Sequence, residues 1–319
     1  MTQLPVGREN PWVSRLHFIM GCTASGKGAL GRELARRLGG QIVSVDSMKI
    51  YRRMDIGTAK PSREAQGETP HHCIDIVEPS EPFSVAQYVA CADEAVASIL
   101  QCAAVPLAVG GTSLYIKALS EGLFEAPPAD PAVREALKAR AVAEGLAALH
   151  VELARVDPAA AGRIHPNDEK RIVRALEVYE TTGTPISELQ RQWDTGRQRY
   201  DCIFVGLRRD KADLNRRINA RAKRMIEMGL RDEVAALLAE PAGIAPQAAQ
   251  AVGYAEMIAH LSGEMTLDET LERIKINTRR LAKKQRTWQR RFTGVEWVDV
   301  GPADSPESVA DEVLRRVGL

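Results

Sequence analysis

The stretch Leu16-His17-Phe18-Ile19-Met20-Gly21-Cys22-Thr23-Ala24-Ser25-Gly26-Lys27-Gly28 begins as an apolar run and ends in a glycine-bounded turn that carries a lysine. Its spacing is G-x-x-x-x-G-K, the pattern of a P-loop, in which backbone N–H groups turn toward phosphate oxygens and the lysine adds a positive charge. Apolar residues then recur at helical spacing, at Leu30, Leu34 and Leu38. The stretch therefore predicts a strand, a phosphate-binding loop and a helix, in that order.

The whole loop is the predicted site for a diphosphate or for the phosphates of a nucleotide, and it comprises Gly21, Cys22, Thr23, Ala24, Ser25, Gly26, Lys27 and Gly28. The Ser or Thr that usually follows the lysine and binds Mg²⁺ is Gly28 here. We still expect Mg²⁺ as the cofactor, with Asp46 as a possible ligand and no metal ligand assigned firmly. A glycine-rich turn that merely joins a strand to a helix is the structural alternative.

Length and composition indicate an ordinary globular chain. Its 319 residues with 45% hydrophobic content suit one large domain or two modest ones. No run is long enough to span a membrane, and residues 1–14 lack the apolar core of a secretory signal, so we expect a cytoplasmic protein with no membrane partner. The five cysteines are odd in number and form no C-x-x-C pair, which argues against a disulfide framework and a zinc site.

A second short strand is predicted at residues 41–45, and we expect it to lie beside the first strand. It is followed by Asp46-Ser47-Met48-Lys49, at the end of the strand where open α/β sheets bind ligands. A carboxylate there can bind a metal or accept a proton beside bound phosphates, although Asp46 or Ser47 could simply cap the next turn. Residues 51–61 are rich in polar and turn residues and indicate an active-site loop more than part of the core.

A third strand is predicted at residues 105–109, after a helix over 83–101 with Ser84 as its N-cap. It ends in Gly110-Gly111-Thr112. Two glycines allow close approach of the backbone to a ligand, and Thr112 adds a hydroxyl in the same crevice. We favour this functional interpretation over a structural turn into a helix at 113–119.

The composition changes to alanine, glutamate and arginine from residue 127 to about 199, with no convincing strand, and a strand returns at residues 202–207. We therefore predict a discontinuous α/β core, 1–122 and 200–319, around a helical insertion at 123–199. Within the insertion, Asn167 or Asp168 caps a helix that ends near Gly183. Arg171 and Arg174 are three residues apart and share one face of this helix. Periodicity alone favours neither a phosphate-contacting role for this face nor a solvated helix face.

Two segments near the C-terminus are strongly basic. Residues 215–224 carry five Lys/Arg and residues 273–291 carry nine, with no acid in either, although the whole chain is only +1. This segregation favours a face that binds a polyanion, and its extent suits nucleic acid better than a mononucleotide. An amphipathic helix with a solvated basic side is the alternative, and Trp288 could stack on a base or pack in the core.

Together these motifs resemble the tRNA dimethylallyltransferase family, also called tRNA isopentenyltransferases. The resemblance covers residues 16 to about 300, through GCTASGKG (21–28), VSVDSMKIYRRMDIGTAKP (43–61), VGGTSLYIKAL (109–119), HPNDEKRIVRALEV (165–178), RRINARAKRMIEMGLRDEV (216–234) and segment 253–291. The chain departs from the family pattern at Gly28 for Thr, Lys49 for Gln, Lys170 for Gln and Ala255 for Lys.

The resemblance implies transfer of a dimethylallyl group from dimethylallyl diphosphate to N6 of adenosine 37, just 3′ of the tRNA anticodon. It implies Asp46, Thr112 and Arg221 as catalytic residues, with Thr23 and Arg221 helping to hold the diphosphate. The implied tRNA contacts are Asp46, Ser47, Met48, Lys49, Thr112, Arg134, Lys170, Arg171, Ile172, Val173 and Arg174. The partners would be the tRNA anticodon stem-loop and dimethylallyl diphosphate, and we expect a monomer.

The expected fold class is α/β, a P-loop NTPase-like parallel sheet flanked by helices with an inserted all-helical lobe. Two other functions stay open at this point. A P-loop kinase of a small nucleotide or metabolite would share the loop, but Gly28 lacks the hydroxyl that Mg-ATP chemistry normally uses. A non-catalytic RNA-binding module with a degenerate P-loop is disfavoured because Lys27, Asp46 and Thr112 fall in one predicted crevice.

Overall fold

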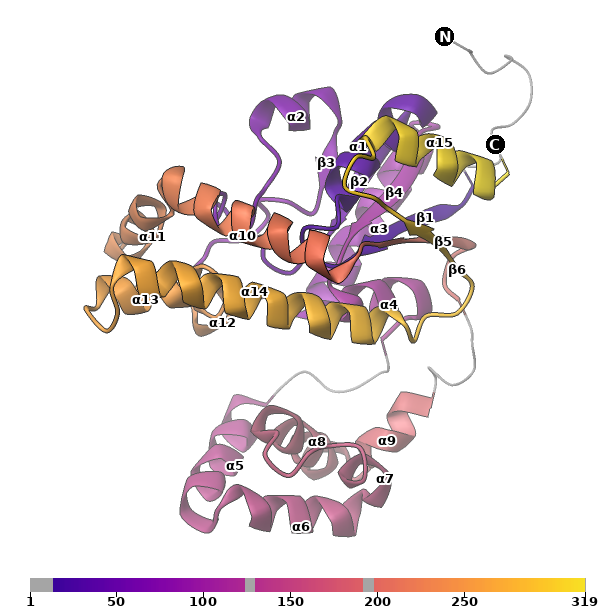
Figure 1. The fold of residues 1–319 in the computed structure, drawn as a ribbon. Helices are drawn as coiled ribbons and strands as arrows, with labels where there is room; N and C mark the ends of the chain where they lie inside the picture. The colour runs from indigo at the N-terminus through magenta and orange to yellow at the C-terminus, as the bar shows by residue number, and fades with distance from the viewer. Residues whose placement is uncertain (1–13, 124–129, 192–197, 319) are drawn as a thin grey trace. The chain divides into compact units, whose positions relative to one another are not determined.

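The computed structural model describes residues 14–123, 130–191 and 198–318. The chain divides into two compact units: residues 1–120 together with 200–319, here called the sheet unit, and residues 121–199, here called the helical lobe (Figure 1). The lobe is inserted between two parts of the sheet unit, so strands from both sides of the insertion meet in one sheet. Each unit is described separately below.

The sheet unit is built on six parallel strands in the order β3-β2-β4-β1-β5-β6. The strands are β1 (Leu16–Gly21), β2 (Gly40–Val45), β3 (His71–His72), β4 (Val105–Gly110), β5 (Cys202–Arg208) and β6 (Val295–Asp299). The predicted α/β class with a parallel sheet is confirmed. The four strands predicted from sequence are β1, β2, β4 and β5, whereas the edge strands β3 and β6 were not predicted.

The expectation that the second strand lies beside the first is wrong. Strand β4 lies between β2 and β1, with Ala108 paired to Val43 on one side and to Phe18 on the other. Every residue of β4 and of β1 is buried, as suits strands at the centre of a sheet covered on both faces. Hydrophobic pattern identifies such strands, but their order depends on where each crossover helix passes, which local sequence does not encode.

Helices cover both faces of the sheet (Figure 1). The helices α1 (Lys27–Leu38) and α15 (Pro306–Arg316) share one apolar cluster with it, through Leu34 and Val313 among others. The larger cluster on the other face includes side chains of α3 (Val85–Gln101), α4 (Ser113–Glu121), α10 (Lys211–Glu227), α11 (Leu230–Ala239), α12 (Pro246–Ala249), α13 (Tyr254–Leu261) and α14 (Leu267–Gln289). None of the described helices is long and apolar enough to cross a membrane.

Two local predictions can be compared with the backbone. Ser84 is the N-cap of α3 and forms a capping box with Gln87, as predicted for its start. Residues 51–61 contain no helix or strand beyond a single bridge at Tyr51, but Tyr51 and Met54 are fully buried. The segment is therefore a loop, as predicted, but Tyr51 and Met54 anchor it in the hydrophobic core. The short helix α2 (Arg63–Glu68) follows it.

The helical lobe has an apolar core of its own, which includes Leu137, Leu149, Leu153 and Leu176. Its helices are α5 (Pro131–Glu144), α6 (Leu146–Val156), α7 (Pro158–Ala161), α8 (Glu169–Thr182) and α9 (Ile186–Leu189), and the described part of the lobe has no strand. Asp168, the second of the two predicted candidates, caps α8 by accepting a hydrogen bond from the Arg171 N–H. The helix ends at Gly183, in the left-handed conformation that favours glycine.

Candidate active site

The P-loop connects β1 to α1 through a turn that needs left-handed backbone. Ala24 has φ 63° and Gly26 has φ 102°, and Gly26 is the N-cap of α1 with no side-chain hydrogen bond. The first turn of α1 contains no acidic residue. Because the first N–H groups of a helix lack intrahelical acceptors and carry partial positive charge, this end of α1 is suited to an anion. The predicted strand, loop and helix are confirmed.

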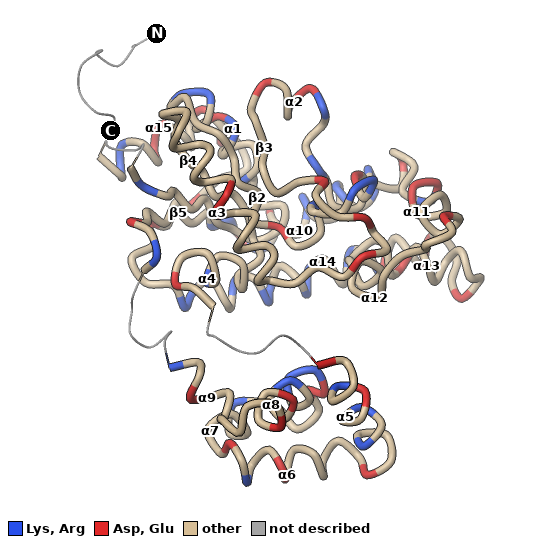
Figure 2. The backbone as a smooth tube through the Cα atoms, turned by 180° about the vertical axis from the view of Figure 1, so that it is seen from behind, with Lys and Arg blue, Asp and Glu red and all other residues tan. Residues whose placement is uncertain are grey.

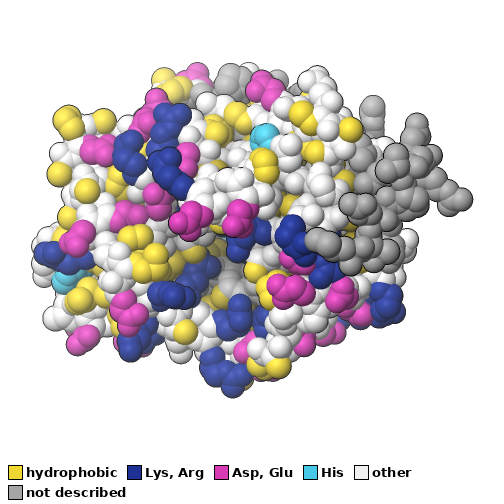
Figure 3. Space-filling view, turned by 90° about the horizontal axis from the view of Figure 1, so that it is seen from above, with side chains coloured by type: hydrophobic (Ala, Val, Ile, Leu, Met, Phe, Trp, Pro, Cys, Tyr) yellow, Lys and Arg dark blue, Asp and Glu magenta, His cyan; other side chains and the backbone are white. Residues whose placement is uncertain are grey.

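A cavity of about 710 Å³, here called the P-loop cavity, opens beside this loop. Its lining contains a single carboxylate, Asp46, and seven basic side chains: Lys27, Arg32, Lys49, Lys60, Arg217, Arg221 and Arg224. Seen from above, Lys and Arg side chains gather around a hollow in this face of the molecule (Figure 3). Such an excess of positive charge is suited to a ligand with several negative charges.

Burial and the neighbouring charges change the pKa of Lys27, the lysine of the P-loop. Lys27 donates from Nζ to the Cys22 carbonyl at 3.3 Å. Burial lowers the pKa of Lys27 to about 8, nearby Lys49 pushes it the same way, and Asp46 opposes both. Burial also lowers the pKa of Lys49. Both ammonium groups are therefore less stable in their charged form than in water, and a bound anion would stabilise that form.

Asp46 follows β2 and has one oxygen engaged and one available. Its Oδ1 accepts hydrogen bonds from the N–H groups of Met48 at 3.0 Å and Lys49 at 3.4 Å, which caps the turn after the strand. Its Oδ2 accepts no hydrogen bond from the described residues. The two interpretations of Asp46 left open by the sequence are thus compatible, since a capped carboxylate still presents a free oxygen to the P-loop cavity.

The glycines after β4 serve protein packing. A Cβ on Gly110 would lie 2.0 Å from the Val45 carbonyl oxygen, and one on Gly111 would lie 2.9 Å from the Gly21 carbonyl oxygen. Packing against the ends of β2 and β1 is therefore enough to require glycine at both positions, and Gly110 also lines the P-loop cavity, so its contact with a ligand stays a prediction. Thr112 does lie in the crevice, where its Oγ1 accepts a hydrogen bond from the Ser47 N–H at 3.1 Å.

Gln285 on α14 is a site residue that the sequence did not reveal. Its Oε1 accepts from the Thr23 N–H at 2.8 Å, and its Nε2 donates to the Gly111 carbonyl at 3.0 Å. One side chain thereby ties the P-loop to the turn after β4. It lies within the basic segment 273–291, where the charge pattern draws attention to the lysines and arginines, and nothing local marks the glutamine.

Arg221 on α10 reaches the same loop. Its Nη1 lies 3.4 Å from Thr23 Oγ1, and its Nη2 donates to the Thr58 carbonyl at 3.2 Å. Two elements far from the P-loop in sequence, α10 and α14, therefore contact Thr23. The predicted diphosphate residues Thr23, Lys27 and Arg221 lie together.

A second cavity of about 250 Å³, here called the Thr112 cavity, adjoins the first. Its polar lining includes Thr23, Ser47, Thr112 and Gln285, and its apolar lining includes Met48, Ile218, Ala222, Met225, Ile274 and Leu281. The two cavities share four charged residues: Lys27, Asp46, Lys49 and Arg221. A strongly cationic space and a smaller space with both polar and apolar walls therefore share the carboxylate of Asp46.

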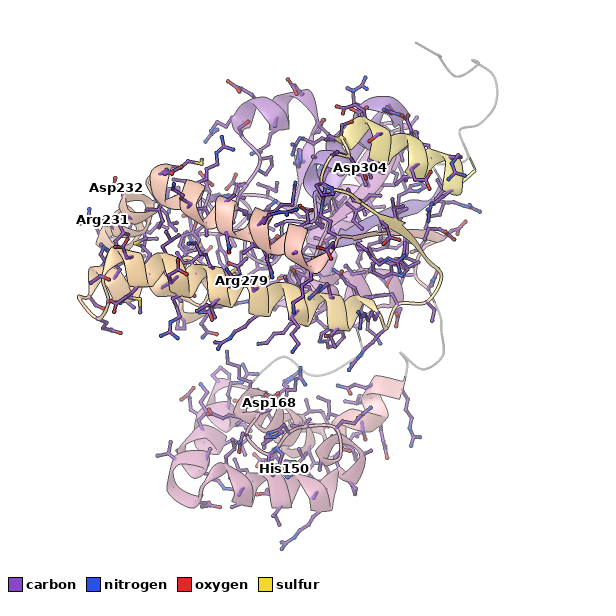
Figure 4. All side chains as sticks on the ribbon, viewed as in Figure 1. His150, Asp168, Arg231, Asp232, Arg279 and Asp304 are labelled. Carbon is purple, nitrogen blue, oxygen red and sulfur yellow. The ribbon has the colours of Figure 1, made fainter. Side chains whose placement is uncertain are left out.

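The predicted RNA contacts of the lobe fall into two groups. Lys170 and Arg171 are exposed at the start of α8, whose N-cap Asp168 is labelled in Figure 4. Ile172 and Val173 have exposed fractions of 0% and 4% and pack in the core of the lobe. Their side chains are buried, so contact through these side chains is not supported, and the RNA contacts of the segment stay a prediction.

Arg134 and Arg174 are held by one buried acid. Glu177 Oε2 accepts from Arg134 Nη2 at 2.7 Å and from Arg174 Nη1 at 3.0 Å. The Glu177 side chain is 1% exposed, whereas those of Arg134 and Arg174 are 37% and 30% exposed. The other oxygen, Oε1, accepts from the Asp130 N–H at the start of α5. The two arginines thus present fixed, partly exposed guanidinium groups.

The basic helices α10 and α14 lie side by side, with Lys and Arg along both (Figure 2). Arg279 on α14 is half-buried, and its guanidinium donates to Asn219 of α10 (Figure 4). The exposed basic residues of the second half of α14 and its end are Arg280, Lys283, Lys284, Arg290 and Arg291. Trp288 is half-buried, with the Arg291 guanidinium 5.0 Å from its ring centre, so it is available at the surface on one side.

The side chains at this site do not form a ligand set for Mg²⁺. Among the described residues there is no group of three or more His, Cys, Asp or Glu able to hold a metal ion. Position 28 offers no hydroxyl, and the one carboxylate of the P-loop cavity, Asp46, has Oδ1 committed to two backbone N–H groups. His71 and His72 hydrogen-bond separately, to the Thr69 carbonyl and to Gln41. Asp46 Oδ2 is therefore the carboxylate oxygen of the cavity lining that fits Mg²⁺, which commonly binds one or two carboxylates together with phosphates and water.

Comparison with known proteins gives consistent results. The sequence model of the family described as IPP transferase matches residues 49–292. A tRNA dimethylallyltransferase of Anaeromyxobacter dehalogenans is 46% identical over 95% of this chain and 100% of its own length. One of Geobacter sulfurreducens is 48% identical over 92% of this chain and 94% of its own length.

Solved structures show the same fold. The tRNA isopentenylpyrophosphate transferase of Bacillus halodurans superposes with a TM-score of 0.68 at 37% identity, covering 95% of this chain and 97% of that one. A eukaryotic dimethylallyltransferase acting on tRNA superposes with a TM-score of 0.78 at 24% identity, over 94% of this chain and 78% of that one. The second likeness supports the fold alone.

Proposed function

The chain belongs to the IPP transferase family, and we propose that it transfers a dimethylallyl group from dimethylallyl diphosphate to N6 of adenosine 37 in tRNA. The observation that carries the assignment of the site is the junction of two cavities at Asp46: one is cationic, and the other has an apolar wall that includes Met48, Met225 and Ile274. A diphosphate ester of a short hydrocarbon combines the two properties that these spaces recognise. Its reacting carbon would lie where they meet.

The P-loop would bind the diphosphate. The N-terminus of α1, Lys27 and Arg221 supply positive charge and N–H donors to its oxygens. As the bond between the allylic carbon and the diphosphate oxygen breaks, negative charge increases on the leaving group. Groups fixed around that position stabilise the transition state more than the ground state, which is the most effective use of electrostatics in catalysis.

Asp46 would act as the general base toward N6 of the adenosine, which accepts the dimethylallyl group. The lone pair of N6 forms the new bond to the allylic carbon, the carbon–oxygen bond breaks toward the diphosphate, and the N6 proton passes to Asp46 Oδ2. This oxygen is suited to the task because no described residue donates a hydrogen bond to it, while Oδ1 is fixed by two N–H groups. Thr112, hydrogen-bonded to the Ser47 N–H, would position the turn that carries Asp46 and the base beside it.

The base must leave the RNA stack to reach this junction. Enzymes that modify a base commonly flip it into a pocket, and single-stranded loops make this less costly. We assign RNA contacts to Lys170, Arg171, Arg134 and Arg174 of the lobe and to the exposed basic residues of α14. The kinase alternative is disfavoured by Gly28, and the non-catalytic alternative by the free carboxylate oxygen at the cavity junction.

The direct test is to incubate the protein with dimethylallyl diphosphate and unmodified tRNA, digest the RNA and look for the mass of a prenylated adenosine. The activity predicts a gain of one dimethylallyl group on one adenosine and release of one diphosphate per transfer. A tRNA with adenosine 37 replaced by guanosine is the matched control. Product from that control, or none from the natural tRNA, would contradict the assignment.

The RNA face can be tested by salt dependence. Replacing Arg280, Lys283, Lys284 and Arg290 with glutamine should weaken tRNA binding and flatten the plot of log affinity against log salt. Each lost phosphate contact reduces the slope by roughly one unit. Arg279 is left out because it is half-buried against Asn219. The control is the pyrophosphate affinity of the same variant, which should equal that of the wild-type protein. An unchanged salt slope would place the RNA elsewhere on the protein.

A further inference from the structure

We propose that Arg32 is a diphosphate ligand in this protein and supplies positive charge beside Gly28, where the usual hydroxyl is absent from the sequence. The proposal rests on the function proposed above and adds a residue to its phosphate site. Arg32 lies on α1, just over one helical turn after Lys27, and lines the P-loop cavity. Residues three and four apart on a helix share a face, so Arg32 and Gly28 face the same side.

The first observation is the space at position 28. A Cβ added to Gly28 would have only one neighbour within 4 Å, the Nη1 atom of Arg32 at 3.9 Å. Magnesium lies about 2.1 Å from its oxygen ligands, so an ion held by a hydroxyl at position 28 would lie roughly 3 Å from that Cβ. The Arg32 guanidinium, at 3.9 Å from this Cβ, is therefore within about 1 Å of the distance expected for the ion.

The second observation is that Arg32 has no partner among residues 14–123, 130–191 and 198–318. It makes no hydrogen bond or ion pair with any residue in the described part of the chain, although it is only half-exposed. The acid next to it, Glu33, is engaged by Arg36 and Arg37 instead. A guanidinium that lines a cavity without an acidic partner is suited to an anionic ligand, and its planar donors match phosphate oxygens.

The surrounding charges agree with this assignment. Burial lowers the pKa of both Lys49 and His71, and Arg32 contributes in the same direction to each. Lys49, His71 and Arg32 all line the P-loop cavity, and Asp46 is its one carboxylate. The guanidinium is therefore held among like charges, an arrangement that a bound diphosphate would relieve.

The test measures binding of inorganic pyrophosphate by calorimetry, in EDTA and then in excess Mg²⁺. The wild-type protein should bind pyrophosphate in EDTA, and Arg32→Leu should bind it at least about tenfold more weakly, as expected for loss of one charge-assisted contact. Arg36→Leu is the matched control, because Arg36 lies one turn further along α1, is exposed and pairs with Glu33. It should keep wild-type affinity.

Two further variants separate charge from geometry. Arg32→Lys should give an intermediate affinity, since it keeps the charge and loses the planar pair of donors. The double variant Arg32→Leu with Gly28→Thr should recover affinity only when Mg²⁺ is added. Thermal melting of each variant tests whether it is folded.

The outcomes are distinguishable from failure of the proposed function. If a folded Arg32→Leu binds pyrophosphate as tightly as the wild type with and without Mg²⁺, the role of Arg32 is overturned, even while the wild type prenylates tRNA. If the wild type neither binds pyrophosphate nor prenylates tRNA, the proposed function itself fails. Equal weakening in Arg36→Leu would also overturn the proposal, because it would indicate a general charge effect of α1.

Discussion

Basic side chains gather both in the P-loop cavity and on the helical lobe, but their partners differ. The P-loop cavity is lined by seven Lys or Arg side chains and one carboxylate. Lys60 is ion-paired with Asp55 and Asp75 outside the lining, whereas Arg32 has no partner among the described residues. In the lobe, Arg134 and Arg174 converge on Glu177, which is almost fully buried. The first arrangement leaves charge to be balanced by a ligand. The second orients two guanidinium groups before any ligand arrives.

This difference suggests two ways of binding phosphate. A small ligand such as a diphosphate can enter a cavity and neutralise several cations at once, so unpaired charge there contributes directly to affinity. A tRNA backbone is contacted one phosphate at a time at a surface, where an arginine already held by an acid loses less conformational entropy on binding. Changes in the two regions should therefore affect different measurements.

The largest expected effect is on turnover. Asp46→Asn should reduce the rate of prenylation by about 10²–10⁴-fold, the usual contribution of a general base, because an amide oxygen does not take the N6 proton. The tRNA affinity should change little, and the pyrophosphate affinity should not fall, because the amide removes a negative charge from the cationic cavity. Asp304→Asn is the control, since Asp304 also accepts a backbone hydrogen bond, from Gly301, and lies outside both cavities (Figure 4). Near-normal turnover in Asp46→Asn would remove Asp46 as the base.

The lobe can be tested with Glu177→Gln, which keeps the shape and removes the charge. We expect tRNA affinity to fall about tenfold, because two guanidinium groups lose the acceptor that orients them, and pyrophosphate affinity to stay unchanged. The free energy of unfolding should fall by about 1–3 kcal/mol. Loss of a negative charge near RNA would by itself raise affinity, so a tighter complex would show that orientation by Glu177 contributes nothing.

The cavity should respond to pH. The pKa of Lys27 in the free protein is about 8, and a bound diphosphate raises it, so above pH 8 the complex holds more protons than the free protein. Affinity should be level below pH 8 and then fall by at most about tenfold per pH unit. A diphosphate monoester is the ligand to use, since pyrophosphate titrates in this range. Lys27→Arg keeps its charge and should flatten the profile, whereas a level wild-type profile to pH 9.5 would contradict the assignment.

The smallest effect concerns position 28. Gly28 lies in the first turn of α1 without positive φ, and the only atom near an added Cβ is at 3.9 Å, so a threonine fits. Gly28→Thr should lower the Mg²⁺ concentration for half-maximal prenylation by about two- to fivefold, a modest change because Mg²⁺ keeps several waters and binds phosphates directly. A higher Mg²⁺ requirement in the variant would mean that a side chain here obstructs the diphosphate or Arg32.

Much of the fold follows from local pattern. Four of the six strands and the capped starts of α3 and α8 were predictable, because apolar periodicity and capping residues act within a few positions of the chain. Strands β3 and β6 were missed: β3 has only two residues, and β6 alternates exposed and partly buried positions at an edge of the sheet. The position of β4 between β2 and β1 was also missed, since strand order is set by contacts across the chain.

The sequence by itself determined the loop between β1 and α1, the carboxylate after the second strand and the presence of a helical insertion, because each depends on residue type and spacing over a short range. Only the tertiary structure decided which side chains meet there. It brought Gln285 and Arg221 to Thr23, paired Arg134 and Arg174 with Glu177, and buried Ile172 and Val173. It also left Arg32 without a partner in the part of the chain that the structure describes. These outcomes depend on packing and burial between elements far apart in the chain, and no local pattern records them.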